Sequence, residues 1–176
     1  MNFIFNNFDD KNSFHDVVKE AGVQGFTEPD PKIDLSGVDV ARKILILIRE
    51  SGYKMEMEEI TNESFLPIEC METKNNEAFF ASLIKHSSHF ENIYKEALAK
   101  ECRLKYVAKF ENGKASVGLQ FIPKESPFYN LEGKDNIVQF YTDRYVDQPL
   151  LIKGAGAGAA VTASGIFADV IRIGNV

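Results

Sequence analysis

Apolar residues recur with helical spacing in three stretches of the first hundred residues. The stretch 13–21 begins with a serine and is followed by a glycine, which predicts a capped helix that ends there. The stretch 37–51 has a wide apolar face, with Ser36 as its expected N-cap and Gly52 as its expected end. The stretch 76–100 keeps the helical register throughout, so the pattern predicts a further helical region there.

The segment between the first two helices carries two prolines, Pro29 and Pro31. Proline lacks a backbone N–H and restricts the residue before it, so regular helix is not expected here. The pattern therefore predicts an ordered loop or an extended connection over 25–34.

The second half of the chain alternates apolar and polar residues, which predicts strands. Residues 104–110 and 117–121 alternate on either side of Asn112-Gly113, a dipeptide typical of a tight hairpin turn. Further strands are expected at 137–141 and 150–153. Because helices come first and strands later, the order of elements predicts an α+β fold rather than an alternating α/β fold.

Composition narrows the classes of function. The chain has 176 residues, of which 44% are hydrophobic and 26% charged, and this fits one globular domain or slightly more. A net charge of -6 without a Lys/Arg cluster argues against a nucleic-acid partner. No stretch reaches the roughly 18 apolar residues that cross a bilayer, and Met1–Phe8 lacks the basic region of a signal peptide. We expect a soluble, cytoplasmic protein with no membrane partner.

Cysteines and histidines give no convincing metal motif. Cys70 and Cys102 belong to no CxxC pair, which is typical of a reducing compartment. His86 and His89 stand at i, i+3 without a cysteine or a carboxylate in the same turn. Two histidines on the polar face of a helix are the simpler interpretation, and no metal site is predicted.

Three acids and one base gather near the start of the second helix. Asp39 and Lys43 are at i, i+4, so both project from one face and can contact a common ligand. Glu28 and Asp34 lie on the proline-stiffened loop that leads to this helix. Carboxylates suit an ammonium ligand, and a lysine can donate a proton to a carbonyl oxygen. The alternative is an exposed surface ion pair that contributes a few tenths of a kcal/mol.

A glycine-rich stretch, 154–158, lies between the last expected strand and a final helix at about 159–173. Free N–H groups at such a turn favour anions. Gly154, Gly156 and Ala159 match the spacing of a dinucleotide-binding turn, but that fold needs a second strand with an acid about 20 residues on, and the chain ends first. A turn of small residues that lets the helix pack closely is the alternative.

Taken together, these segments resemble the homoserine dehydrogenase family. Residues 25–31 (GFTEPDP) and 34–43 (DLSGVDVARK) resemble the signature of that family, and residues 154–163 (GAGAGAAVTA) resemble its C-terminal glycine stretch. The resemblance covers essentially the whole chain, in the right order. It implies a mixed, largely antiparallel sheet with helices packed on one face.

The resemblance also implies a division of labour. In the family an N-terminal Rossmann domain binds NAD(P), and the domain after it provides substrate contacts, catalysis and dimerisation. Asn2–Phe5 resembles the stretch just after that Rossmann domain, so we expect the Rossmann domain to be absent from this chain. We expect residues 1–153 to form the catalytic, substrate-binding and dimerisation domain of a homodimer. Residues 154–176 are expected to form the glycine turn and a helix that returns to the nucleotide-binding domain.

Roles for five residues follow from the resemblance. Lys43 is the expected proton donor, with Asp39 as its partner beside the reacting oxygen. Glu28 and Asp34 are the expected ligands of the substrate amino group. Gly158 matches a glycine whose backbone approaches the nicotinamide end of the cofactor.

Two positions depart from the family pattern. Phe26 stands where many members have tyrosine, so a hydroxyl contact is lost. Ile33 stands where aspartate is frequent, but Asp34, the acid that the site needs, is present.

The implied reaction is the interconversion of L-aspartate 4-semialdehyde and L-homoserine with NAD(P), a step of threonine and methionine biosynthesis. The resemblance fits both free-standing enzymes and enzymes fused to an aspartate kinase. Without a Rossmann domain the chain is expected to be inactive. Two alternatives stay open at this point: a truncated dimerisation module without turnover, and a dehydrogenase of a related amino-aldehyde.

Overall fold

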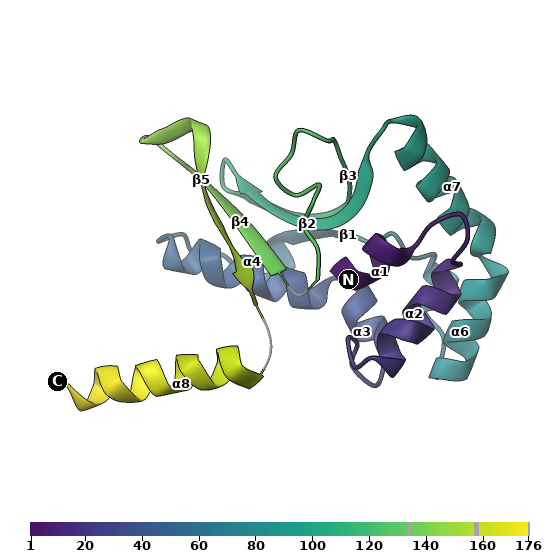
Figure 1. Ribbon diagram of the computed structural model, residues 1–176, viewed down its shortest axis with the longest axis horizontal. Coiled ribbons are helices and arrows are strands. Elements are labelled where there is room, and N and C mark those ends of the chain that lie inside the picture. The colour runs from purple at the N-terminus through teal and green to yellow at the C-terminus, as the bar shows by residue number, and fades with distance from the viewer. Residues whose placement is uncertain (134, 157–158, 176) are drawn as a thin grey trace. The chain divides into compact units, whose positions relative to one another are not determined.

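The computed structural model describes residues 1–133, 135–156 and 159–175. They form two compact units, Met1–Tyr129 and Asn130–Val176, each with a sheet of its own (Figure 1). The first unit contains all the expected substrate-side residues, so it is the unit that positions the candidate site.

Helices make up most of the first hundred residues of the first unit. Ser13 caps α2 as expected, because its Oγ accepts a hydrogen bond from the Asp16 N–H at 3.1 Å. The helical region expected at 76–100 is divided in two at His86, which leaves helical geometry with φ -100° and ψ 19°. The helices of this unit are α1 (Asn2–Asn7), α2 (Phe14–Val23), α3 (Pro31–Leu35), α4 (Val38–Glu50), the short 3₁₀ helix η1 (Met57–Glu59), α5 (Ile68–Met71), α6 (Asn76–Lys85) and α7 (Ser87–Ala99).

The sheet of the first unit has three strands in the order β1-β3-β2. The hairpin of β2 (Arg103–Glu111) and β3 (Lys114–Ile122) is confirmed, with φ of 51° at Asn112 and 75° at Gly113. Positive φ at both central residues is the geometry that matches the twist of a two-residue hairpin. The third strand, β1 (Ile60–Glu63), pairs in parallel with β3 and was not predicted.

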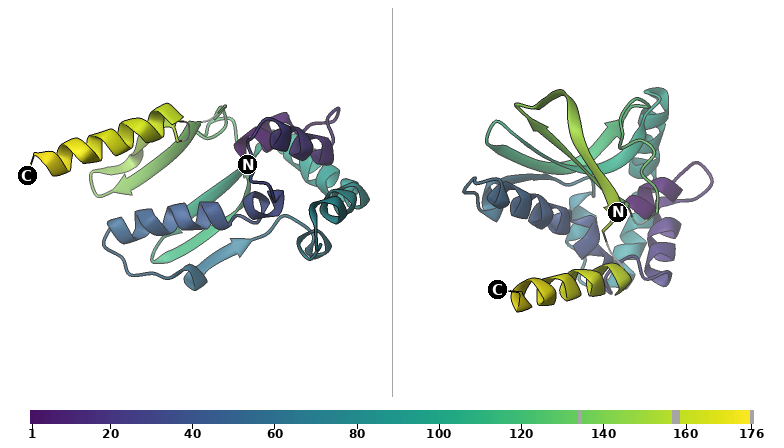
Figure 2. Two further views of the ribbon diagram at one scale, coloured as in Figure 1. Left: turned by 90° about the horizontal axis from the view of Figure 1, so that it is seen from below. Right: turned by 60° about the vertical axis from the view of Figure 1, so that its left-hand side comes forward.

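One face of this sheet carries the core. Even positions of β2 pair with odd positions of β3, so Leu104, Tyr106 and Ala108 lie on the same face. At one end α4 lies along this face, as Figure 2 shows. Its buried apolar side chains form a cluster with those of the sheet. At the other end α1, α2, α6 and α7 bury a second cluster that contains Leu104 and contacts Tyr106. Tyr106 therefore lies where the two clusters meet.

One expectation about the loop was wrong. Residues 25–34 were expected to contain no regular helix, but α3 begins at Pro31. Proline is tolerated at the first position of a helix, because the N–H that it lacks would have no partner there. Asp30 caps α3 by accepting a hydrogen bond from the Lys32 N–H at 3.1 Å.

The second unit consists of an antiparallel pair of strands and a helix. β4 (Asp135–Thr142) pairs with β5 (Tyr145–Ala155), and α8 (Ala159–Gly174) follows. Large apolar side chains of β5 and α8 are exposed, among them Ile152, Ile166 and Phe167.

The α+β class, with mixed and antiparallel sheets and helices, is confirmed. Within the described ranges, no helix has the length and apolar character needed to cross a bilayer.

Candidate active site

Helix α4 presents Asp39 and Lys43 on its outer side. Its buried residues Ala41, Leu45 and Ile48 hold it against the sheet. Lys43 Nζ lies 2.8 Å from Asp39 Oδ2, and the two side chains are 62% and 57% exposed. An ion pair this exposed adds little to stability, so both groups are available to a ligand.

The loop before α4 places the other two acids. The Glu28 N–H donates to Asp34 Oδ2 at 2.8 Å, which closes the segment between them into a compact turn. One oxygen of Asp34 is therefore used by the backbone, and Oδ1 has no hydrogen-bond partner among the described residues. The Glu28 side chain is exposed.

Contacts to α6 and to the segment before it hold this loop in place. Asn76, the first residue of α6, donates through Nδ2 to the Pro29 carbonyl oxygen at 2.7 Å. Lys32 Nζ donates to the Thr73 carbonyl oxygen, also at 2.7 Å. A loop anchored at both ends loses little conformational entropy when its carboxylates bind a ligand.

Asp34 lies next to the start of α4, because the Gly37 N–H donates to the Asp34 carbonyl oxygen at 3.4 Å. The charges of three of these side chains also act on the amino group of Met1. Burial is the main cause that lowers its pKa, and the charges of Asp34, Lys43 and Asp39 have smaller effects. Glu28 joins this group through its bond to Asp34.

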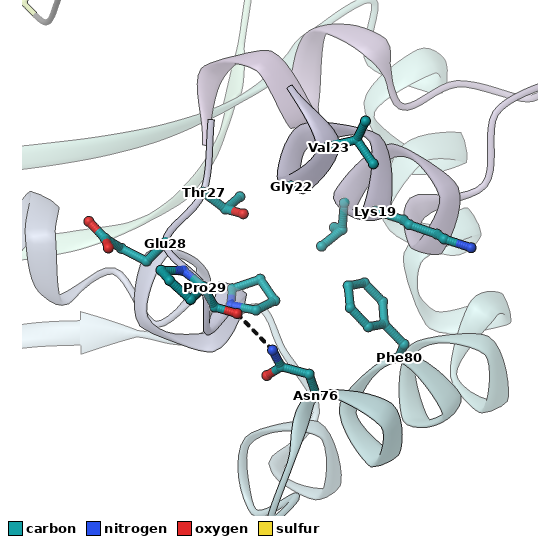
Figure 3. A pocket seen from close by; sticks show the side chains of 10 residues that line it. Lys19, Gly22, Val23, Thr27, Glu28, Pro29, Asn76 and Phe80 are labelled. Carbon is teal, nitrogen blue, oxygen red and sulfur yellow. Dashed lines mark hydrogen bonds between the residues drawn. The ribbon is translucent and has the colours of Figure 1, made fainter. Parts of the chain in front are cut away.

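A cavity of about 460 Å³ lies on the other side of the same loop, between α2 and α6. Pro29, Asn76 and Phe80 line it, and Glu28 lies at its rim. Figure 3 shows the Glu28 carboxylate turned away from the cavity. The cavity is therefore not where the expected substrate ligand points.

Two residues that support the start of α4 from the sheet were not predicted from the sequence. Tyr106 Oη donates to Asn62 Oδ1 at 2.9 Å, and Asn62 Nδ2 donates to the Ser36 carbonyl oxygen at 2.7 Å. No sequence signal marked them, because Tyr106 occupies an ordinary position of an alternating strand and Asn62 lies on the strand that was not predicted. Burial, with Glu63 as a second cause, raises the pKa of Tyr106 to about 12.

The glycine stretch is described only in part. Gly158, the expected cofactor contact, lies outside the described residues. A Cβ added at Gly154 would meet nothing within 4 Å, whereas one at Gly156 would overlap the Asn136 side chain. Gly156 therefore permits close packing within the second unit, and Gly154 leaves its backbone open.

His89 and Cys70 make hydrogen bonds within the first unit. His89 Nε2 lies 2.8 Å from the Phe65 carbonyl oxygen. Cys70 is buried and accepts a hydrogen bond from Ser82 Oγ at 3.1 Å. In the part of the chain that the structure describes, no group of three or more His, Cys, Asp or Glu side chains is arranged to hold a metal ion.

Comparison with known proteins places this arrangement in context. A family model described as homoserine dehydrogenase matches residues 1–171. The bifunctional aspartokinase/homoserine dehydrogenase 1 of Arabidopsis thaliana is 43% identical over 175 residues, which cover 98% of this chain and 19% of that protein. The homoserine dehydrogenase of Paracoccidioides brasiliensis is 39% identical over 184 residues, covering 98% of this chain and 50% of that protein.

Two solved structures share the fold. A Candida auris protein described as of unknown function has a TM-score of 0.89 and 37% identity, covering 99% of this chain and 50% of its own. A putative homoserine dehydrogenase of Archaeoglobus fulgidus has a TM-score of 0.73 and 25% identity, covering 98% of this chain and 47% of its own. The chain thus spans about a fifth of the bifunctional relatives and about half of the shorter ones.

Proposed function

Because the chain belongs to the homoserine dehydrogenase family, we propose that it is the substrate-binding and catalytic part of an NAD(P)-dependent homoserine dehydrogenase. The reaction is the interconversion of L-aspartate 4-semialdehyde and L-homoserine, in the biosynthesis of threonine and methionine. The observation that carries this proposal is the exposed Asp39–Lys43 pair, 2.8 Å apart, on a helix whose N-cap Gly37 donates its N–H to the Asp34 carbonyl oxygen at 3.4 Å.

Each side chain has a distinct task in this proposal. In the direction of reduction, Lys43 Nζ donates a proton to the aldehyde oxygen as negative charge develops there. Asp39 holds Nζ in place and balances its charge. A group that acts on charge present only in the transition state raises kcat rather than ground-state binding.

The substrate ammonium is assigned to the loop acids. Asp34 keeps one oxygen on the Glu28 backbone and offers the other, and the exposed carboxylate of Glu28 completes the pair. Two carboxylates on an anchored loop favour an amino-aldehyde over a neutral aldehyde. They do not by themselves select its length, so longer and shorter amino-aldehydes belong in the same assay.

The described residues fit only one end of the cofactor. The open space beside Gly154 suits the approach of a flat ring, and Gly158, outside the described residues, stays the expected contact. A second strand with an acid about 20 residues beyond the glycines, which a dinucleotide fold requires, is not among the described residues. We therefore assign most of the NAD(P) contacts to a nucleotide-binding domain outside residues 1–176. When bound, the nicotinamide supplies hydride for the reduction.

We also propose that the enzyme is a homodimer. Neighbouring residues Leu150, Leu151 and Ile152 of β5 are all exposed, although they point alternately to the two faces of the strand. Exposed apolar area on both faces is typical of a strand that is covered in an assembly. Exposed apolar residues of α8, such as Val170, suit packing against the nucleotide-binding domain.

A reducing compartment such as the cytoplasm is the proposed location. Cys70 and Cys102 are both free thiols, which is usual where disulfides do not form. The Arabidopsis thaliana relative is described as chloroplastic.

A turnover assay tests the function. The chain alone, mixed with NADPH and aspartate semialdehyde, is expected to leave the nicotinamide absorbance unchanged. The same chain joined behind a nucleotide-binding domain of a relative is expected to oxidise NADPH only when the semialdehyde is added. A folded, cofactor-binding fusion without this turnover would contradict the proposal, and turnover only with another amino-aldehyde would favour the related dehydrogenase.

A further inference from the structure

Two side chains distant in sequence reach the turn from which α4 begins. Tyr106 Oη donates to Asn62 Oδ1 at 2.9 Å, and Asn62 Nδ2 donates to the Ser36 carbonyl oxygen at 2.7 Å. The partners are separated by 44 and 26 residues along the chain. These bonds therefore tie two strands of the sheet to the residue two positions before α4.

The next residue is packed against the same tyrosine. Gly37 is buried with φ at +79°, and a Cβ at this position would overlap the Tyr106 hydroxyl. Gly37 is also the N-cap of α4, and it offers no side chain to the free N–H groups of the first turn. The N–H of Val38, the first residue of the helix, instead donates to Ser36 Oγ at 3.3 Å, and the tyrosine packs against the backbone of Gly37.

The first turn of α4 is also where the candidate chemistry lies. Asp39 is the second residue of the helix, and Lys43 lies one turn further on. A helix whose first turn shifts carries both side chains with it. Errors of about 1 Å in the placement of a reacting group can cost about 10²-fold in rate.

We propose that Tyr106 and Asn62 are positioning residues, which hold the Ser36-Gly37 turn so that Asp39 and Lys43 keep their place at the reacting oxygen. The kinetic part of this proposal rests on the proposed function. The mechanical part, that the two side chains fix the start of α4, does not depend on it.

The tyrosine is suited to holding rather than to transferring a proton. Burial and the nearby Glu63 carboxylate raise its pKa to about 12, so the hydroxyl keeps its proton and remains a donor to Asn62 throughout the neutral range. The Gly37 N–H also donates to the Asp34 carbonyl oxygen at 3.4 Å, but Glu28 and Asp34 have further support through their own bond and through Asn76. Loss of the tyrosine hydroxyl should therefore disturb proton donation more than ammonium binding.

Hydrogen exchange on the 176-residue chain tests the mechanical part. The Ala41 N–H bonds to the Gly37 carbonyl oxygen at 2.9 Å and so reports on the first turn of α4. In Tyr106→Phe this amide should exchange roughly five- to tenfold faster, the effect of one lost hydrogen bond, while the amide of Ile48 near the helix end stays unchanged. Equal exchange in wild type and variant would overturn the proposal.

Tyr53→Phe is the matched control. Tyr53 packs its ring on Phe110 of the same sheet, with centroids 4.9 Å apart, and is 54% exposed. Its hydroxyl has no hydrogen-bond partner among the described residues, so its loss should leave the Ala41 amide as it is in the wild type.

Kinetics of the chain joined to a nucleotide-binding domain test the other part. Tyr106→Phe should lower kcat about five- to twentyfold and change KM for the amino substrate less than about twofold. Asn62→Ala should lower kcat by a similar factor. The double variant should have a kcat no lower than either single variant, because both substitutions break the same chain of hydrogen bonds. Additive losses of kcat would show that the two residues act separately, against the proposed connection. An unchanged kcat with a lowered melting point would show that the pair only stabilises the fold.

Lys43→Ala in the same assay distinguishes a failure of the positioning role from a failure of the proposed function. If Lys43→Ala removes most of the activity and Tyr106→Phe does not, the positioning role fails while the proposed function stands. If Lys43→Ala has no effect on kcat, the proposed function itself fails, whatever the tyrosine variant does.

Discussion

The candidate residues of α4 are marked by their spacing along one helix, whereas the residues that support them lie on other elements and contact the helix only in the folded chain. Asp39 and Lys43 could be predicted from the sequence because i, i+4 spacing on a helix is a local property. Asn62 and Tyr106 could not, because their partners are 26 and 44 residues away. The carboxylate of Asp34 is intermediate: its type and place were predicted, but its bond to the Glu28 N–H was not.

Removing the charge of Glu28 tests whether this carboxylate binds the substrate ammonium. Glu28→Gln preserves the side-chain shape and the backbone bond to Asp34 but removes the negative charge. Losing one charged partner of the substrate ammonium costs roughly 1.5–3 kcal/mol, so kcat/KM should fall about ten- to a hundredfold. Steady-state kinetics of the enzyme with its nucleotide-binding domain measure this.

Glu72→Gln is the control, because Glu72 is exposed at the end of α5. It should keep the kinetics and the melting point of the wild type. If Glu28→Gln lowers the melting point and leaves kcat/KM unchanged, Glu28 belongs to the structure of the loop and not to the site.

Among the elements, those with a local signal were predicted best. The β2–β3 hairpin needs only alternation and Asn112-Gly113 between the strands, and it formed as expected. β1 was missed because, of its four residues, only Ile60 is buried, and its parallel pairing to β3 depends on chain far away. α3 was missed because Pro31 was read as a helix breaker, although it begins the helix.

The packing of Gly37 at the start of α4 predicts how a substitution there changes the stability of the fold. Gly37→Ala should lower the free energy of unfolding by about 1–3 kcal/mol, because it combines a positive φ with overlap against the Tyr106 hydroxyl. Gly52→Ala is the matched control, since Gly52 has φ +87° but nothing within 4 Å of an added Cβ.

Denaturant unfolding of both variants separates the two effects. The cost of Gly52→Ala measures backbone strain alone, and the additional cost of Gly37→Ala measures the packing against Tyr106. Equal costs at the two positions would contradict the close contact between the tyrosine and the turn.

For the whole molecule, the sequence predicted the class of fold but not where the compact units divide. The structure separates Met1–Tyr129 from Asn130–Val176, whereas the expected functional boundary at 153/154 stays a prediction. Sheet-forming residues such as Leu151 remain exposed in the second unit. In the proposed assembly such residues are covered by another chain or domain, and the pattern of one chain does not contain that information.

The proposed dimer can be tested by mass. Light scattering should give twice the 19.8 kDa of one chain, and Leu151→Asp should shift the mass toward one chain, because a buried unpaired charge is costly at an interface. Ile84→Asp, at an exposed apolar position of α6 in the first unit, is the control and should leave the mass unchanged. A single-chain mass in the wild type at all concentrations would contradict the proposal.

The central claim is that Lys43 handles the proton at the reacting oxygen. It is tested most directly by kcat of Lys43→Ala in the chain joined to a nucleotide-binding domain, with Lys95→Ala as control. Lys95 forms an equally exposed i, i+4 pair with Glu91, at 3.7 Å. Lys43→Ala should lower kcat by about 10²–10⁴-fold, the usual contribution of a positioned acid, with a small change in KM and in melting point. A kcat equal to that of Lys95→Ala would show that the Asp39–Lys43 pair is only a surface ion pair.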